Sequence, residues 1–208
     1  VTVNAGTGNV SLTESDAIAV AAVTHTGTLT LNAGANGITQ TGDIEVGAGA
    51  LTLTGGTITL ANTANTFGAI TVNSGAGDVS LRQDGAMGVT GITRTSGNLT
   101  LNANGNASDL TQTGAILIGT GTADLTAANI TLGSANVLGA VTVNAGTGNV
   151  SLTESDAIAV AGITHTGNLV LDAGANDITQ TGAILIGTGT AGLTASNITL
   201  GSANVLGA

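Results

Sequence analysis

Short stretches in which apolar and polar residues alternate run along the whole chain, separated by clusters of Gly, Asn, Asp and Ser. Alternation with a period of two is typical of a β-strand that buries one side, and the intervening clusters are typical of turns. Glycine recurs too often for stable helices. The pattern therefore predicts an all-β chain of short strands. The strand-like triplets of the first unit begin at Val1, Val10, Ile18, Leu29, Ile38, Ile44, Leu51 and Ile58.

Longer repeats organise these strands into three units. Residues 1–21 recur without a change at residues 141–161, and residues 71–81 are a diverged copy of the same segment. A second comparison agrees, because residues 115–140 return at residues 183–208 with only two substitutions. The three units are residues 1–69, 70–140 and 141–208.

Within the first unit, related strands recur roughly every 20 residues, which predicts three short strands per turn in a parallel β-helix. We expect right-handed coiling, the general preference of parallel crossovers. The predicted fold is an all-β, right-handed parallel β-helix (β-solenoid) of about nine or ten rungs, roughly 45 Å long. Val, Ile and Leu should point inward, Thr and Ser outward, and Gly and Asn should form the corners. The expected stacks are Val1, Val23, Ile44; Val10, Leu29, Leu51; and Ile18, Ile38, Ile58.

The composition agrees with a solenoid and disfavours several kinds of partner. The chain has 34 Gly, one Phe and no Trp, Tyr or Cys, so it lacks the aromatic filling of an ordinary globular core. Its formal net charge of −10 disfavours nucleic acid, which needs a basic surface. No apolar stretch is long enough to cross a bilayer. We therefore expect neither nucleic-acid binding nor membrane insertion.

The sequences of the two chain ends would continue the repeat if they were joined. Residues 201–208 followed by residues 1–8 have the same sequence as residues 133–148. The chain begins at Val1 without a recognisable signal peptide. We expect a single β-solenoid segment, residues 1–208, that is either an excerpt of a longer array or a fibre subunit. Its expected partner is a further copy of itself.

The style of the repeats resembles a known family. The order GNVSLTESDAIAV, GNLVLDAG, DITQTGAI and NITL, with the sequence NTFGAITV from Asn65 at one unit boundary, is similar to filamentous haemagglutinin-type exoproteins. Those are large adhesins of Gram-negative bacteria, commonly exported by two-partner secretion. The resemblance covers essentially the whole chain. It implies a right-handed β-helix, an extracellular or bacterial cell-surface location, and attachment to a host-cell, matrix or biofilm surface.

Carboxylates are the first candidates for chemistry. Glu14 and Asp16, repeated as Glu154 and Asp156, have the spacing of an acid pair or of calcium ligands, but the middle unit has neither acid there. A catalytic pair needs both groups and a shaped cleft, so we expect solvated turns. Two further acids receive the same interpretation: Asp43 and Glu45.

Calcium is a separate question. Calcium-dependent β-rolls use Gly-Gly-x-Gly-x-Asp nonapeptides, and no segment here matches that pattern. The nearest approach is Gly75-Ala-Gly-Asp78, whose acid is replaced by Asn9 and Asn149 in the other units. A weak surface calcium ion is left open. No other cofactor is expected.

Three other residue types recur at matching positions. His25 and His165 occupy Thr-His-Thr triplets, and Arg94 takes that place in the middle unit. Because Arg tolerates burial poorly, we expect the position to face outward, and one His per unit is too sparse for a metal site. Asn and Gln at Gln40, Gln112, Gln180, Asn129 and Asn197 predict hydrogen-bonded ladders between turns.

Thr-x-Thr triplets invite an ice-binding interpretation, because a regular Thr ladder on a flat face orders water. The middle residue varies, however, and Thr is also a common outward strand residue. The triplets lie at Thr24/Thr26, Thr39/Thr41, Thr52/Thr54, Thr57/Thr59, Thr111/Thr113 and Thr179/Thr181.

An enzyme is not expected. Lys and Cys are absent, both Arg residues lie in one unit, and no Ser is paired with a His in a recognisable setting. We therefore assign no catalytic, cofactor-binding or metal residues. The predicted function is that of an extracellular structural or adhesive rod or fibre. An ice-binding solenoid is the alternative, and a polysaccharide-degrading β-helix is a weaker one.

Overall fold

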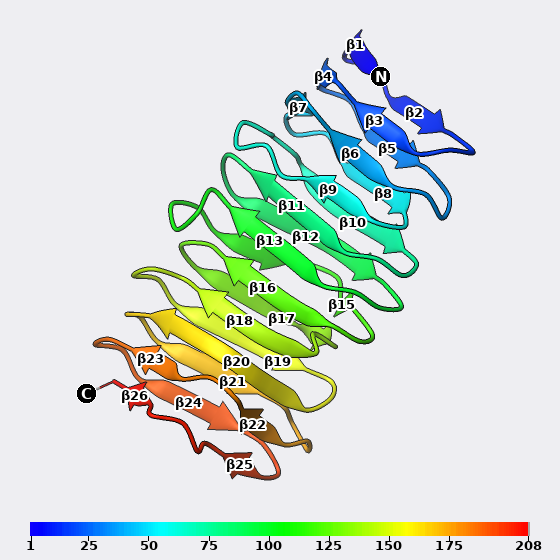
Figure 1. Cartoon of the computed structure of the whole chain (residues 1–208). Coiled ribbons are helices and arrows are strands. Elements are labelled where there is room, and N and C mark those ends of the chain that lie inside the picture. The colour runs from blue at the N-terminus through cyan, green and yellow to red at the C-terminus, as the bar shows by residue number, and fades with distance from the viewer. Residues whose placement is uncertain (208) are drawn as a thin grey trace.

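The computed structural model describes residues 1–207, and within them the chain forms 26 strands and no helix. The turns stack from the N-terminus at one end of the molecule to the C-terminus at the other, about ten in all (Figure 1). Neighbouring strands pair in parallel. The predicted parallel β-solenoid is confirmed, whereas its right-handed sense stays a prediction.

The strands form three hydrogen-bonded ladders. One ladder contains β1 (Thr2–Gly6), β4 (Ala22–His25) and β7 (Ile44–Glu45). An 11-stranded sheet contains β2 (Val10–Thr13), β5 (Leu29–Asn32), β8 (Leu51–Gly55), β10 (Ala69–Ser74), β12 (Met87–Thr93), β14 (Leu110–Gln112), β15 (Ile116–Leu117), β17 (Ile130–Asn136), β19 (Val150–Glu154), β21 (Leu169–Asp172) and β24 (Ala191–Thr194). A 12-stranded sheet contains β3 (Ile18–Val20), β6 (Ile38–Gln40), β9 (Ile58–Leu60), β11 (Val79–Gln83), β13 (Leu99–Ala103), β16 (Thr122–Thr126), β18 (Ala140–Asn144), β20 (Ile158–His165), β22 (Ile178–Gln180), β23 (Ile184–Ile186), β25 (Ile198–Thr199) and β26 (Val205–Leu206).

These ladders make two faces. In the third unit, the counterparts of β3 and β4 are fused in one strand, β20, and β18 runs along both halves of it. The small ladder β1–β4–β7 is therefore a lateral continuation of the 12-stranded sheet. We call the 11-stranded sheet face I, and the 12-stranded sheet with the small ladder face II. The predicted three strands per turn occur only in some turns, such as β3, β4 and β5 or β22, β23 and β24, whereas β20 and β21 complete a turn with two strands.

Each unit crosses the solenoid seven times. In the first unit the crossings are β1, β2, β3–β4, β5, β6–β7, β8 and β9, alternately on face II and face I. Because seven is an odd number, successive units begin on opposite faces. Val10, Val79 and Val150 are counterparts, yet Val10 and Val150 lie on face I and Val79 lies on face II. Equivalent residues are thus presented on alternate faces from unit to unit.

One apolar core runs along the axis of the rod. The predicted stacks that start at Val10 and at Ile18 are confirmed by the strand register. The third stack starts at Val3 and not at Val1, because Val3 is the residue that pairs with Val23. Inward Val, Ile and Leu of the middle turns are fully buried, and each contributes about 2 kcal/mol through removal of apolar surface from water.

Glycine ladders form the tightest corners. A Cβ atom on Gly27 would overlap the backbone carbonyl of Gly8 in the preceding turn, and one on Gly49 would overlap that of Gly27. Only glycine permits this approach of backbone to backbone. Each unit has one such ladder of four glycines, which we call the glycine ladder. The members are Gly8, Gly27, Gly49 and Gly68; Gly77, Gly97, Gly121 and Gly139; and Gly148, Gly167, Gly189 and Gly207.

Asn and Asp side chains link successive corners. Asn129 Oδ1 accepts the backbone N–H of Asn149 at 2.9 Å, and Asn149 Oδ1 accepts that of Asn168 at 2.8 Å. Asp78 takes the equivalent place in the middle unit and accepts the N–H of Asn98 at 2.8 Å. The predicted ladder is therefore confirmed at Asn129. It is confirmed at Asn197 as well, which donates to Asp177.

Candidate functional site

The outward surfaces of both faces carry rows of short side chains in register. On face I, a row of hydroxyls extends over four turns through Ser11, Thr30, Thr52 and Thr71. A second row lies beside it and consists of Thr13, Asn32, Thr54, Asn73 and Thr93. The Thr52/Thr54 triplet belongs to these rows, whereas the triplet at Thr39/Thr41 begins on β6 of face II. The Thr-x-Thr triplets therefore lie on different strands of both faces.

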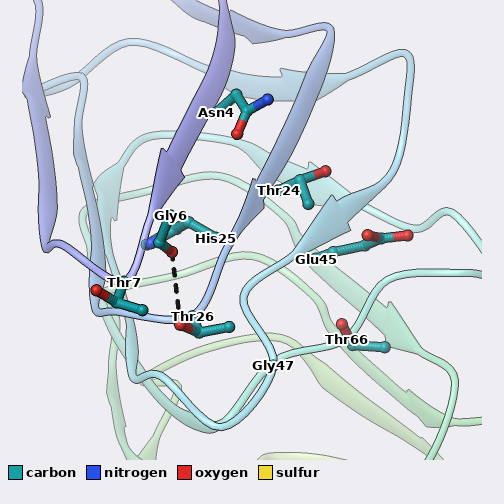
Figure 2. Close-up of a pocket in the computed structure, with 9 residues that line it drawn as sticks. All are labelled: Asn4, Gly6, Thr7, Thr24, His25, Thr26, Glu45, Gly47 and Thr66. Carbon is teal, nitrogen blue, oxygen red and sulfur yellow. Dashed lines mark hydrogen bonds between the residues drawn. The ribbon is translucent and has the colours of Figure 1, made fainter.

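A hollow of about 500 Å³ lies on face II across the small ladder β1–β4–β7 (Figure 2). One row of outward residues in register lines it over four turns: Asn4, Thr24, Glu45 and Thr66. At its edge, Thr26 Oγ1 donates to the carbonyl of Gly6 at 3.4 Å. Glu45 is exposed, as expected, but it lies on a strand and not in a turn. It is the only carboxylate that lines the hollow, so the hollow offers hydrogen bonds without an acid pair.

The same row recurs in the other two units with apolar residues in its last two places. It reads Asn73, Thr93, Leu117, Val137 on face I and Asn144, Thr164, Leu185, Val205 on face II. We call all three rows the outward rows. Leu117 is 37% exposed, Leu185 40% and Val205 53%. These exposed apolar side chains alternate between the two faces from the second unit to the third.

The structure overturns the expectation for the basic residue of each unit. His25, Arg94 and His165 are buried and point into the corner, because each side chain binds the first carbonyl of its glycine ladder. Nδ1–H of His25 donates to Gly8 O at 3.2 Å. Nδ1–H of His165 makes the matching bond at 3.1 Å. The outward prediction was wrong because a carbonyl that approaches so closely offers a buried Arg or His a hydrogen-bond partner.

Arg94 makes the most extensive of these contacts. Its guanidinium donates to the carbonyls of Gly77, Ser96 and Asn98, the last at 2.7 Å from Nη1. Burial lowers the pKa of Arg94, and the charge of Asp78 opposes that effect. The guanidinium remains protonated and acts as a clamp on the corner. In each of these three residues, the nitrogen that donates to the corner carbonyl cannot bind a metal ion at the same time.

One of the two acid pairs is also not a solvated turn. Glu14 and Asp16 are exposed, as predicted, but Glu154 is only 5% exposed. Its Oε2 accepts the backbone N–H of Leu138 at 3.1 Å. Oε1 of Glu154 and Oδ1 of Asp156 are both buried without a hydrogen-bond partner. Burial raises the pKa of Glu154 to about 8, the bond from Leu138 opposes the rise, and the charge of Asp156 adds to it.

The middle unit places a neutral residue at the position of Glu154. Gln83 is 2% exposed and its Nε2 donates to the carbonyl of Ala86. Its Oε1 is buried without a partner, as is Oε1 of Glu154. An amide therefore fills the same inward place as the carboxyl group. The exchange is consistent with a protonated Glu154 that supports the turn.

A half-buried Gln–Asn pair recurs in all three units, and the sequence predicted only its Gln member. Gln40 Nε2 donates to Asn65 Oδ1 at 2.8 Å, and Asn65 Nδ2 donates back to Gln40 Oε1 at 2.8 Å. Asn65 also donates to the carbonyl of Arg82 in the next turn. Gln112 with Asn136 and Gln180 with Asn204 repeat the pair. The ladder predicted for the Gln residues is confirmed, and alignment of the three units would have revealed the partner Asn.

Two other features are absent from residues 1–207. No group of three or more His, Cys, Asp or Glu side chains is placed to hold a metal ion. No helix that is long and apolar enough to span a membrane is present in the same residues. Polar rows on two flat faces, with corner ladders inside, are the features that recur from unit to unit.

Stacked parallel turns, homologous units and internal corner ladders define a repeat protein of the β-solenoid class. A family model described as repeats of unknown function (DUF5649) matches residues 7–73, 76–145 and 147–208, one match for each unit. The chain belongs to this family. No curated protein and no solved structure matches the chain.

Proposed function

We propose that this chain is an extracellular structural rod of a bacterial surface that carries attachment surfaces along its length. The observation that supports the proposal best is the odd number of crossings per unit, which presents the outward row on alternate faces. A rod of this kind offers contacts on two sides with one repeated sequence. The extracellular location rests on the resemblance of the repeats to filamentous haemagglutinin-type adhesins.

The mechanical part of the proposal rests on the core and the corners. Successive turns are held together by apolar stacking and the glycine ladders, and once in each unit by a half-buried Gln–Asn pair, so the rod resists bending and each added turn adds length. The faces carry few charges, and the net charge of −10 keeps rods apart in solution. Contact with another surface is then left to the exposed apolar members of the outward rows.

Attachment through these rows would be weak at each unit and strong in sum. A single Leu–Val pair has little apolar area, but pairs repeated along one rod act together once the first contact forms. On one face, equivalent rows are two units apart, or seven turns, which is about 34 Å. We expect tight attachment to extended surfaces and weak binding to small molecules.

The test compares attachment of beads coated with the chain to matrix-coated and cell-covered surfaces under flow. The matched variant carries Leu117→Glu and Leu185→Glu, because the first unit already has Glu45 at this place. We expect several-fold fewer attached beads for the variant, with circular dichroism unchanged. Wild-type beads that attach no better than beads coated with an unrelated acidic protein would contradict the adhesive role.

The hydroxyl rows on face I favour one second candidate, an ice-binding surface. Ser11, Thr30, Thr52 and Thr71 form a flat row of hydroxyls with a spacing of about 4.8 Å. Inhibition of ice recrystallisation by the purified chain is the measurement. Thr52→Lys should abolish it and Thr142→Lys, on face II, should leave it intact. Crystals that grow as in buffer alone would exclude this candidate.

A further inference from the structure

The strands of face I from β2 to β19 carry no outward charged residue. Their outward residues are Ser, Thr, Asn, Gly, Ala and Leu, and the first charged residue that follows on this face is Asp172 of β21. Face II differs, because its strands carry Glu45, Arg82 and Asp124. A chain with a net charge of −10 thus has one uncharged side.

A hollow of about 80 Å³ lies on this uncharged side between β12 and β14, and Thr90 and Thr111 are among its walls. Thr90 is the extra residue of a β-bulge, because it has no partner on β10. Gly88 leaves the hollow open, since a Cβ atom there would meet no atom within 4 Å. The first and third units have Ala19 and Ala159 at the place of Gly88.

Two apolar side chains lie at the other end of the same crossings. Leu117 is 37% exposed, and it pairs with Thr93 of β12 and with the half-buried Val137 in the next turn. Because Gly88 and Thr93 both lie on β12, Leu117 and the hollow are about 15 Å apart across the face. One turn further on, Gly133 of β17 also leaves open space. Face I therefore has apolar protrusions along one side and gaps along the other.

We infer that face I binds face I of a second copy, with the two rods parallel and related by a two-fold axis that runs along the rods. Rotation about this axis exchanges the two sides of the face and keeps each turn at its level. Leu117 of each copy then enters the hollow beside the partner's Gly88, and Val137 meets the partner's Gly133. In an antiparallel pair each side of the face would meet itself, so protrusions would meet protrusions.

The size of face I is sufficient for such a pair. The eight crossings from β2 to β19, each about 4.8 Å high and about 20 Å wide, present about 750 Å² per copy. A stable protein interface buries about 800 Å² per partner. The side chains are short, so two flat sheets can approach closely, as they do in dry interfaces between paired sheets.

The distribution of charge favours face I for this contact. The acids lie at corners, on face II, in the core or on β21, so pairing brings no charged side chain of strands β2 to β19 together. Salt screens the remaining repulsion between two acidic rods, so pairing should strengthen as ionic strength rises. The inference rests on the proposed function and deepens it, since it assigns Leu117 to a second copy and leaves Leu185, on face II, for other surfaces.

Single-Cys variants test the orientation, because the chain has no Cys of its own. Thr30 and Gly91 belong to one row, which passes through Thr52 and Thr71 and runs between the protrusions and the gaps. The two-fold axis lies over this row. Thr30→Cys and Gly91→Cys chains should therefore each link to an identical copy through a short bismaleimide. The two positions are about 14 Å apart along the rod, so self-linking at only one of them would overturn the parallel pair.

A mixed reaction tests the contact itself. Leu117→Cys chains should link to Gly88→Cys chains in an equimolar mixture, because the two positions meet across the axis. Leu117→Cys alone should give little linked product, since the two copies of this residue lie far apart on opposite sides of the axis. Self-linking of Leu117→Cys that exceeds its linking to Gly88→Cys would overturn the proposed contact.

Two variants that keep the fold test the energy of the contact. Gly88→Val fills the hollow with a residue that favours strands, and Leu117→Thr removes the protrusion. Each should weaken dimerisation in analytical ultracentrifugation by about tenfold or more, with circular dichroism unchanged. Gly162→Val and Leu185→Thr are the matched controls on face II and should dimerise as the wild type does.

The contrary results are equally specific. Gly88→Val and Leu117→Thr chains that dimerise as tightly as the wild type would overturn the inference. A wild-type chain that stays monomeric at high concentration and high salt would overturn it too, and face I would then be left to a different partner.

The outcome for pairing is separable from that for the proposed function, because Gly88→Val leaves the outward rows unchanged. Gly88→Val rods that are as monomeric as the wild type but attach to surfaces under flow would contradict pairing and support attachment. Wild-type rods that pair in the expected register but do not attach would support pairing and contradict adhesion.

Discussion

Residues 1–21 and 141–161 have the same sequence but different surroundings. In the inner copy, Val143, Val150 and Leu152 are buried between two turns, whereas Val3, Val10 and Leu12 of the first turn contact a turn on one side only and are partly exposed. Glu154 is buried and Glu14 is exposed. The comparison teaches that a residue's burial in a solenoid is a property of the neighbouring turn, because half of its contacts come from there.

The largest expected effect comes from removing a buried Leu from one copy and not the other. Leu152→Ala should destabilise the rod by about 4 kcal/mol, since it leaves a cavity between two turns. Leu12→Ala should cost about 1 kcal/mol, because its site is already open on one side. Denaturant unfolding followed by circular dichroism gives both values. Equal losses would contradict the comparison.

The glycine ladder provides the next test. Gly167→Ala should cost about 3 kcal/mol, because the new methyl group would overlap the carbonyl of Gly148 and push two turns apart. Gly162→Ala is the matched control, since its Cβ would meet no atom within 4 Å and the first unit has Ala22 there. Thermal unfolding midpoints measure the difference. Similar midpoints for the two variants would show that the corner adapts.

The buried carboxyl group predicts a dependence on pH. The pKa of Glu154 is raised to about 8 in the folded chain, so the unfolded chain releases this proton at a lower pH, and the stability contributed by the neutral carboxyl is lost as pH rises from about 5 to 8. Glu154→Gln, as in the middle unit, should therefore raise stability at pH 8 by more than about 1.4 kcal/mol, the free energy of a tenfold difference in proton affinity.

Two comparisons define this prediction. At pH 4 the Glu154→Gln variant and the wild type should be about equally stable, because the carboxyl group is then neutral in both states. Glu14→Gln should have little effect at either pH, since Glu14 is exposed. A constant difference between pH 4 and pH 8 would contradict a protonated Glu154.

The smallest expected effect concerns the basic residue at the corner. His165→Ala should cost about 1 kcal/mol, because the carbonyl of Gly148 loses its side-chain donor. His165→Arg should restore most of the stability, since Arg94 holds the same corner in the middle unit. Calorimetric midpoints at neutral pH distinguish the two. An Arg variant less stable than the Ala variant would show that the corner of the third unit is specific for His.

Most of the fold could be predicted from the sequence, because period-two alternation and repetition are local signals. The register of Val10 with Leu29 follows from both signals and is confirmed. The orientation of His25 could not be predicted in this way, because its partner, Gly8, is one turn away and glycine carries no side-chain signal. The Asn partners of the half-buried Gln residues could not be predicted for the same reason, since Gln40 and Asn65 are 25 residues apart.

The sequence alone determined the strands, the three units and the parallel stacking, because each depends on patterns that repeat along the chain. The tertiary structure decided which face each unit presents, since this depends on the odd number of crossings per unit. That number is seven because β3 and β4 lie end to end in one crossing, as their counterparts do in the single strand β20. It also decided that identical residues Glu14 and Glu154 differ in burial. The physical reason is that stacking supplies neighbours from the adjacent turn, and no residue's own sequence window contains them.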